Sequence, residues 1–283
     1  MKFGGLLNIK ITNMKSNLTS IGTVENCNAK INELFIRWEE QLNKDGFFGF
    51  CRDGLMFRGE NWKEQGDDGK LYDGKYSGNE ETMWANVPKR ILFLLKDSNK
   101  NPGYDNREFY PGVKGSLNTH YRNLAYWLFG LLAFDETKDA PAFESLNLWD
   151  EVYSVFDTKP FAIVNCKKES GGSYVSNENL QEHINRYADF IKEEIAILNP
   201  DIIVCGGGSS LIKKFVADNV YRNLEKINNW IYFDKFNNKV VIDSYHPSYW
   251  QISGGSKTIY TKMMNAYKEF LEKHPDFRHN CRM

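Results

Sequence analysis

The chain has 283 residues, 41% of them hydrophobic, so it can bury a substantial core. It contains no run of about 18 apolar residues, and its N-terminus is too short an apolar patch for a secretory signal, so we expect a cytoplasmic protein without membrane contacts. The formal net charge of −1 gives no global basic field for nucleic acid, although a local basic rim would be enough to hold a short stretch of backbone.

The first third of the chain predicts one helix between two irregular segments. Residues 1–27 are polar and rich in asparagine, which indicates a loosely ordered lead-in. Residues 44–88 are rich in glycine, acidic and aromatic residues, so we expect an irregular insertion there. An amphipathic helix ending at Asp45–Gly46 is predicted by apolar residues at helical spacing, namely Ile31, Leu34, Phe35, Trp38 and Leu42.

Four short apolar runs set the predicted fold, at Ile91–Leu95, Phe161–Val164, Ile202–Cys205 and Val240–Ile242. Branched apolar residues without polar alternation are typical of parallel strands that are covered on both faces. Helices are predicted between and after them over 118–133, 176–198 (with Ser176 as N-cap), 209–217 and 257–273, and Trp230–Phe233 is a possible edge strand.

This alternation of strands and helices predicts a three-layer α/β/α domain with a central, mostly parallel four-stranded sheet. We expect it to span residues 28–275 as one domain that includes the 44–88 insertion, with a tail over 276–283.

Polar residues follow each of the four runs. They are Lys96-Asp97-Ser98-Asn99, Asn165-Cys166-Lys167-Lys168, Gly206-Gly207-Gly208-Ser209 and Asp243-Ser244-Tyr245-His246-Pro247-Ser248. Because ligands of parallel sheets bind outside the carboxyl ends of the strands, we predict a pocket where Asp97, Asn165 and His246 converge.

These motifs resemble the uracil-DNA glycosylase superfamily over roughly residues 88 to 270. The family has a catalytic Asp directly after its first strand, an Asn that ends the second, and a His-Pro-Ser motif after the last. Asp97, Ile163-Val164-Asn165 and His246-Pro247-Ser248 match these features in order. The resemblance implies a monofunctional glycosylase for base-excision repair of uracil or a modified pyrimidine, with single- or double-stranded DNA as its partner, and we expect a monomer.

The resemblance also implies a role for each matched residue. Asp97 would face the sugar and activate the attacking water, and His246 would donate a hydrogen bond to the leaving base. Asn165, with Asn99 beside it in the pocket, would read the edge of a flipped pyrimidine. DNA or phosphate contacts would come from Ser98, Ser248, Lys167, Lys168, Gly208, Tyr249 and Trp250.

The first motif departs from the family pattern. Lys96, Ser98 and Asn99 stand where the family has Gln, Pro and Tyr, and the missing Tyr usually excludes a 5-methyl group. A roomier pocket that accepts a 5-substituted base is therefore an open alternative. The five cysteines form no C-x-x-C pair, and the iron–sulfur ligands of some family branches are absent, so we expect free thiols, no metal and no cofactor.

Two other functions compete with the glycosylase. Asp97-Ser98 and Asp243-x-x-His246 resemble blocks of SGNH-type esterases, with Ser98 as nucleophile and His246 as base held by Asp243. Lys96 replaces the glycine of the first block, however, and the Gly-x-Asn-Asp block is missing. A non-catalytic, glycosylase-like module that binds nucleic acid or nucleotide is the second alternative, because a Lys96 salt bridge could neutralise Asp97.

Several candidates also have simpler interpretations. The glycine run at 206–208 suits a tight turn, and Tyr249 and Trp250 suit core anchors as well as a DNA wedge. We expect the remaining histidines to lie on helix or tail surfaces without a functional role, and these are His120, His183, His274 and His279.

Overall fold

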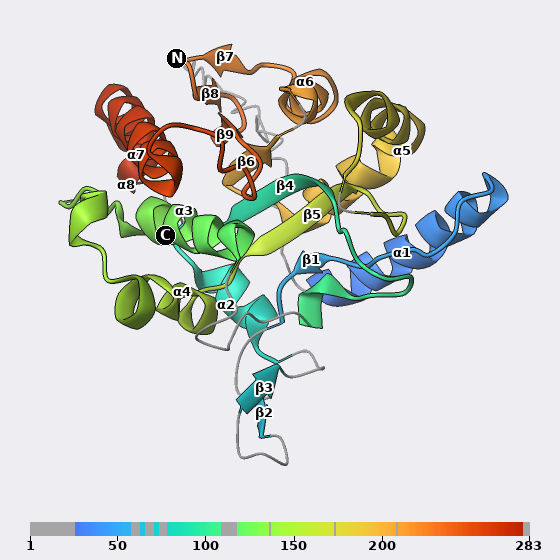
Figure 1. Ribbon diagram of the computed structural model, residues 1–283. Helices are drawn as coiled ribbons and strands as arrows, with labels where there is room; N and C mark the ends of the chain where they lie inside the picture. The colour runs from blue at the N-terminus through green and yellow to red at the C-terminus, as the bar shows by residue number, and fades with distance from the viewer. Residues whose placement is uncertain are drawn as a thin grey trace, which may run out of the picture.

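The computed structural model describes residues 26–57, 63–65, 71–73, 78–108, 118–135, 137–172, 174–207 and 209–279. Seven strands within these ranges form one sheet in the order β1-β5-β4-β6-β9-β8-β7 (Figure 1). The four central strands are parallel and contain the four predicted runs: β5 (Ala162–Lys167), β4 (Ile91–Asp97), β6 (Ile202–Gly206) and β9 (Lys239–Ser244). The predicted parallel four-stranded core is therefore confirmed.

Antiparallel strands extend this core on both sides. β1 (Gly54–Leu55) pairs with β5 at one edge, and β8 (Ile231–Asp234) pairs with β9 on the other side. β7 (Glu225–Lys226) pairs with β8 and forms the outer edge, so the strand predicted over Trp230–Phe233 lies one place further inside. β2 (Lys63–Gln65) and β3 (Leu71–Asp73) form a separate two-stranded sheet.

Helices cover both faces of the sheet (Figure 1). One layer contains α3 (Thr119–Ala133), α4 (Ser154–Thr158) and α7 (Gly255–Lys273), and the other contains α1 (Cys27–Lys44), α5 (Asn177–Leu198) and α6 (Leu211–Phe215). β4 shows why its run is continuously apolar: Phe93 packs into the α3 layer, while Leu92 and Leu94 pack into the α5 layer. The three-layer α/β/α prediction is confirmed.

The predicted helix boundaries follow from local capping. Asn118 accepts the Tyr121 N–H at 3.2 Å, and Ser176 accepts the Asn179 N–H at 3.1 Å, so each side chain starts a helix. The helix predicted over 209–217 is shorter, because α6 passes at once into a π turn. The short 3₁₀ helices and π turns span Asn106–Glu108, Phe143–Ser145, Leu148–Val152 and Val216–Val220.

The 44–88 segment and the C-terminal residues are more regular than the sequence suggests. The 44–88 segment contributes β1 to the main sheet and α2 (Glu80–Asn86), whose buried Trp84 donates to the Leu198 carbonyl at 2.9 Å. The predicted tail begins as α8 (Pro275–His279), with Phe277 buried against the core. The predicted lead-in lies outside the described residues up to position 25. Among the described helices, none is long and apolar enough to cross a membrane.

The order of the central strands opens a crevice at their carboxyl ends. After β4 the chain adds β5 on one side, and then crosses to add β6 on the other side of β4. Neighbouring crossover helices therefore leave the sheet in opposite directions, which is the arrangement that places ligand sites at the end of the central strand.

Candidate functional site

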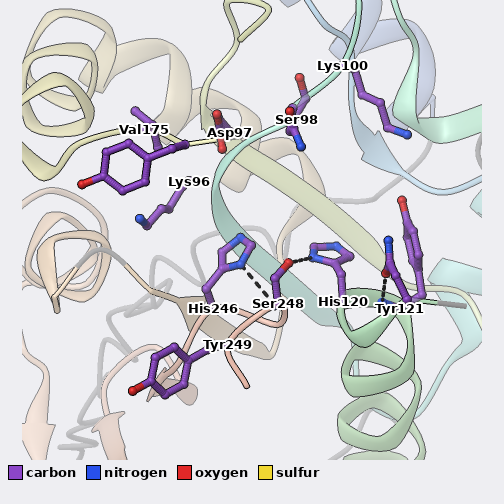
Figure 2. A pocket seen from close by; sticks show the side chains of 13 residues that line it. Lys96, Asp97, Ser98, Lys100, His120, Tyr121, Val175, His246, Ser248 and Tyr249 are labelled. Atoms are coloured by element: carbon purple, nitrogen blue, oxygen red, sulfur yellow. Dashed lines mark hydrogen bonds between the residues drawn. The ribbon is translucent and has the colours of Figure 1, made fainter. Parts of the chain in front are cut away.

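A cleft of about 370 Å³ lies at the carboxyl end of β4 (Figure 2). Its walls come from the end of β4 and the residues that follow it, the start of α3, the segment before α5 and the loop after β9. The lining residues are Lys96, Asp97, Ser98, Asn99, Lys100, Asn118, His120, Tyr121, Tyr174, Val175, His246, Ser248 and Tyr249. The cleft is thus mostly polar and draws on four separate parts of the chain.

A smaller cavity of about 40 Å³ shares one wall with the cleft. Asp97, Ser98, His120 and Tyr121 line both spaces, whereas Asn165 lines only the smaller one. The remaining residues of the smaller cavity are Met56, Leu95, Asn106 and Ile163. Asp97 therefore borders both the space that contains His246 and the space that contains Asn165.

Asp97 ends β4 as a half-buried carboxyl. Burial raises its pKa above the ordinary range, while the positive charges of Lys167 and then Lys96 act in the opposite direction. Lys167 is close by, because a Cβ placed on Gly171 would lie 3.3 Å from Lys167 Nζ and 3.5 Å from Asp97 Oδ2. The proton affinity of Asp97 thus reflects lost hydration, which raises it, and two neighbouring ammonium groups, which lower it.

His246 is held as a neutral imidazole. Burial, assisted by the charge of Lys96, lowers its pKa from 6.5 to about 4. Its Nδ1 accepts the Ser248 backbone N–H at 3.2 Å, and a nitrogen that accepts carries no proton, so the proton is on Nε2. Neutral His246 can therefore donate a hydrogen bond from Nε2 into the cleft.

Two contacts hold the His-Pro-Ser loop in place. The buried Asn123 side chain of α3 donates to the Pro247 carbonyl at 2.7 Å. On the other side, Gly207 has φ +91°, and a Cβ there would lie only 2.9 Å from the His246 Cβ. The glycine is required at this position both for its backbone conformation and for the close approach of His246.

Asn165 is buried at the end of β5 and is oriented by Asp53. One Asp53 carboxylate oxygen accepts both the Asn165 backbone N–H, at 2.8 Å, and the Nδ2–H, at 2.9 Å. Since a carboxylate cannot donate, the Asn165 amide has its nitrogen toward Asp53, and its carbonyl oxygen is directed elsewhere. Asp53 was not among the predicted site residues.

His120 lies in the cleft and not on an open helix surface as expected. It lines both cavities, its Nδ1 is 3.3 Å from the Ser248 hydroxyl, and its ring centre is 5.5 Å from that of His246 (Figure 2). Burial, followed by the charges of His246 and Lys100, lowers its pKa to about 3, so it is also neutral. The sequence could have predicted this position, because the helix after β4 starts at the carboxyl edge of the sheet and His120 lies in its first turn.

His183 also departs from the surface expectation. It is buried in α5, where its ring packs on Phe47, and it lies 3.5 Å from a Glu169 carboxylate oxygen. His274 follows α7 and packs against Phe233 and Phe270.

Lys167, which ends β5, and Lys168, which follows it, do not lie at an exposed phosphate-binding surface. Lys167 is buried and pairs with Glu169 at 3.1 Å, and it lines neither cavity. Lys168 is completely buried, pairs with Asp53 and Glu194, and lies over the rings of Phe35 and Trp38. We therefore leave Lys168 out of the proposed site and consider Lys167 only as a neighbour of Asp97.

Four of the other predicted contact residues line the cleft. Asn99, Ser98 and Ser248 line it, and Asn99 has the left-handed φ of 45°. Tyr249 lines it and stacks on Tyr245 with ring centres 5.0 Å apart. Trp250 is 69% exposed and does not line the cleft, and Gly208 lies outside the described residues.

The esterase arrangement gains no support from these contacts. Asp243 accepts a hydrogen bond from Ser210 at 2.7 Å. His246 Nδ1 accepts from the Ser248 backbone, so the nitrogen that a triad directs at its carboxylate is already in use. Among the described residues, no cluster of His, Cys, Asp and Glu has the arrangement of a metal site.

The fold and the cleft define an α/β protein with a polar site at the carboxyl edge of a parallel sheet. The chain matches the family model of the uracil DNA glycosylase superfamily over residues 120–271, which is more than half of its length. The matched segment includes His120, Asn165 and His246, and begins after Asp97. The chain therefore belongs to the uracil DNA glycosylase superfamily. A search of curated proteins found no match.

Proposed function

We propose that this chain is a monofunctional DNA glycosylase that hydrolyses the N-glycosidic bond of uracil or a modified pyrimidine in DNA. The observation that carries the proposal is the position of Asp97, which borders a cleft with two neutral imidazoles and a small cavity with the Asn165 amide. Membership in the superfamily suggests the same class of activity.

In the proposed step, Asp97 takes a proton from a water whose oxygen forms a bond to the sugar C1′. The electron pair of the broken C1′–N bond goes to the departing base, while the sugar passes through an oxocarbenium-like state. The Nε2–H of His246 stabilises the negative charge on the base oxygen. A neutral imidazole suits this role, because the proton on its Nε2 is enough to donate a hydrogen bond to the developing negative charge.

The base would occupy the small cavity, with its edge against Asn165. The DNA strand would lie along the cleft, where Ser98, Asn99 and Ser248 offer donors to phosphate or sugar oxygens. Tyr249 lines the cleft and the exposed Trp250 follows it in the chain, and both rings suit stacking on a neighbouring base.

The proposal is tested with single- and double-stranded oligonucleotides that carry uracil, 5-hydroxymethyluracil or an alkylated base, followed by alkali. We expect strand breaks at the target with at least one substrate, and a loss of about 100-fold or more in Asp97→Asn. Asp189→Asn is the matched control, because that side chain is 94% exposed on α5.

Breaks that persist in Asp97→Asn would contradict the assigned role. A complete lack of breaks with wild-type protein on every substrate would favour a non-catalytic module. Labelling of Ser98 by a fluorophosphonate probe would instead favour the esterase, because a glycosylase has no activated serine.

A further inference from the structure

Two imidazoles line the cleft, but only one of them also borders the small cavity. His246 lines the cleft alone, whereas His120 lines both spaces. His120 lies in the first turn of α3, next to Tyr121, and the two rings make a T-shaped contact with centres 4.9 Å apart. His120 is therefore at the border between the two spaces, where a base in the small cavity would be joined to its sugar in the cleft.

Ser248 connects the two imidazoles. Its backbone N–H donates to His246 Nδ1 at 3.2 Å, and its hydroxyl lies 3.3 Å from His120 Nδ1 (Figure 2). Because Ser248 lines the cleft but not the small cavity, the Nδ1 side of the His120 ring meets the cleft, which leaves the far edge with Nε2 for the small cavity. Among the residues that the structure describes, none forms a hydrogen bond with His120 Nε2, so this nitrogen is available to a ligand.

The hydroxyl of Ser248 allows His120 to present a donor to the small cavity. A hydroxyl can donate or accept, so it fits either tautomer of the imidazole. A base oxygen that gains negative charge needs a donor, and it selects the tautomer with the proton on Nε2, while the hydroxyl donates to Nδ1. Burial, followed by the charges of His246 and Lys100, lowers the pKa of His120 to about 3, so the ring stays neutral at ordinary pH.

We infer that His120 is a second catalytic residue, whose Nε2–H donates a hydrogen bond to the base oxygen beside the glycosidic bond. In a pyrimidine this oxygen is O2, on the carbon next to the N1 that is released from C1′. A carbonyl oxygen has two lone pairs, so O2 can accept from His246 on the side of the cleft and from His120 on the side of the small cavity. The inference rests on the proposed function for the reaction and for the location of the base.

Three variants of the full chain separate this role from a structural one. His120→Phe keeps a ring beside Tyr121 but has no nitrogen, so we expect single-turnover excision to fall about tenfold or more with little change in substrate affinity. A glutamine amide nitrogen can take the place of Nε2, and an asparagine amide nitrogen that of Nδ1. His120→Gln should therefore restore part of the rate, whereas His120→Asn, which keeps only the contact with Ser248, should not. His274→Gln is the control, because His274 lines neither space.

The dependence of the rate on the departing base is the decisive readout. A site that lacks one donor relies more on the acidity of the base itself, so among 5-substituted uracils the loss in His120→Phe should be largest for the least acidic base. A variant that is merely destabilised loses the same factor with every base. As a second measurement, addition of free uracil should shift the ¹⁵N NMR signal of His120 Nε2 and leave the ring signals of His274 unchanged.

The outcomes distinguish the inference from the proposed function. Wild-type excision with unchanged rates in all three His120 variants overturns only the inference, and so does a rate in His120→Asn that equals the rate in His120→Gln. If His120→Phe fails to fold, this comparison of His120→Gln with His120→Asn decides the question. A shift of His120 Nε2 on addition of uracil, without excision of any substrate, overturns only the proposed function, and the lack of both overturns both.

Discussion

Removing the Lys167 ammonium is expected to shift the pH dependence of base excision to higher pH. The Asp97 carboxyl has to be ionised to accept a proton from water, so the rate should fall about tenfold for each pH unit below its pKa. Burial raises this pKa, and Lys167 is the stronger of the two cations that oppose the rise. Lys167→Met therefore raises the pKa further, and the acidic limb of the profile moves with it.

The size of the shift follows from the geometry around Gly171. The distances from its Cβ position, 3.3 Å to Lys167 Nζ and 3.5 Å to Asp97 Oδ2, place these two charged atoms no more than about 7 Å apart. Unit charges at that separation interact by about 2 kcal/mol at an effective dielectric constant of about 20. Solvent in the half-buried cleft screens part of this energy, so a shift of about one pH unit remains.

The assay is single-turnover excision measured from about pH 4 to pH 9, with the Asp97 carboxyl pKa also measured by NMR. Lys96→Met is the matched control, since it removes an equal charge with a smaller effect on Asp97. His246 and His120, with pKa values of about 4 and about 3, should add no inflection near pH 6.5. An acidic limb that stays in place or moves down in Lys167→Met would refute the electrostatic reasoning.

Four further outcomes are expected. Gly207→Ala should lower the excision rate at least about tenfold and the stability by about 1–3 kcal/mol, because the added Cβ pushes His246 away and strains the backbone. Gly172→Ala is the control, because the space around its Cβ is open, and equal excision rates for the two variants would contradict this account. Asp53→Asn should cost about 3–5 kcal/mol in urea unfolding, because it leaves buried Lys168 with one carboxylate, and a loss below about 1 kcal/mol would contradict that account. Asn123→Ala should lower the excision rate more than substrate affinity by freeing the Pro247 loop, and a change in affinity alone would argue against this positioning role. Excision rates along a series of 5-substituted uracils should rise with the acidity of the departing base, and a flat series would point to a rate-limiting step other than bond cleavage.

The parallel core was predictable because burial on both faces leaves a local trace in the sequence. The Ile91–Leu95 part of β4 needs apolar side chains at every position, since Phe93 and Leu94 face different helix layers. The same reasoning placed Asp97 and His246 at one edge of the sheet, because the carboxyl ends of parallel strands lie together. These conclusions depend on short-range pattern and on topology alone.

The residues that orient the site could not be found in this way. Asp53 lies 112 positions from Asn165 and 115 from Lys168, so no periodicity links them. The adjacent lysines at 167 and 168 suggested an exposed basic rim, because the local sequence does not show which carboxylates surround them in the fold. Their burial depends on Glu169 beside one and on distant Asp53 and Glu194 around the other, and only the folded sheet brings Asp53 and Glu194 to Lys168.

The charge balance around Asp97 indicates which part of the transition state the proposed site has to stabilise most. With Lys167 nearby and Lys96 adjacent, the carboxylate offers less net stabilisation to a cationic sugar than an isolated carboxylate would. More of the barrier has to be lowered at the departing base, where charge is negative and these cations are favourable. His246 and His120 lie in the same cleft as uncharged imidazoles, and the proton fixed on His246 Nε2 provides a donor there. The altered first motif is therefore compatible with glycosidic hydrolysis if the base is a good leaving group.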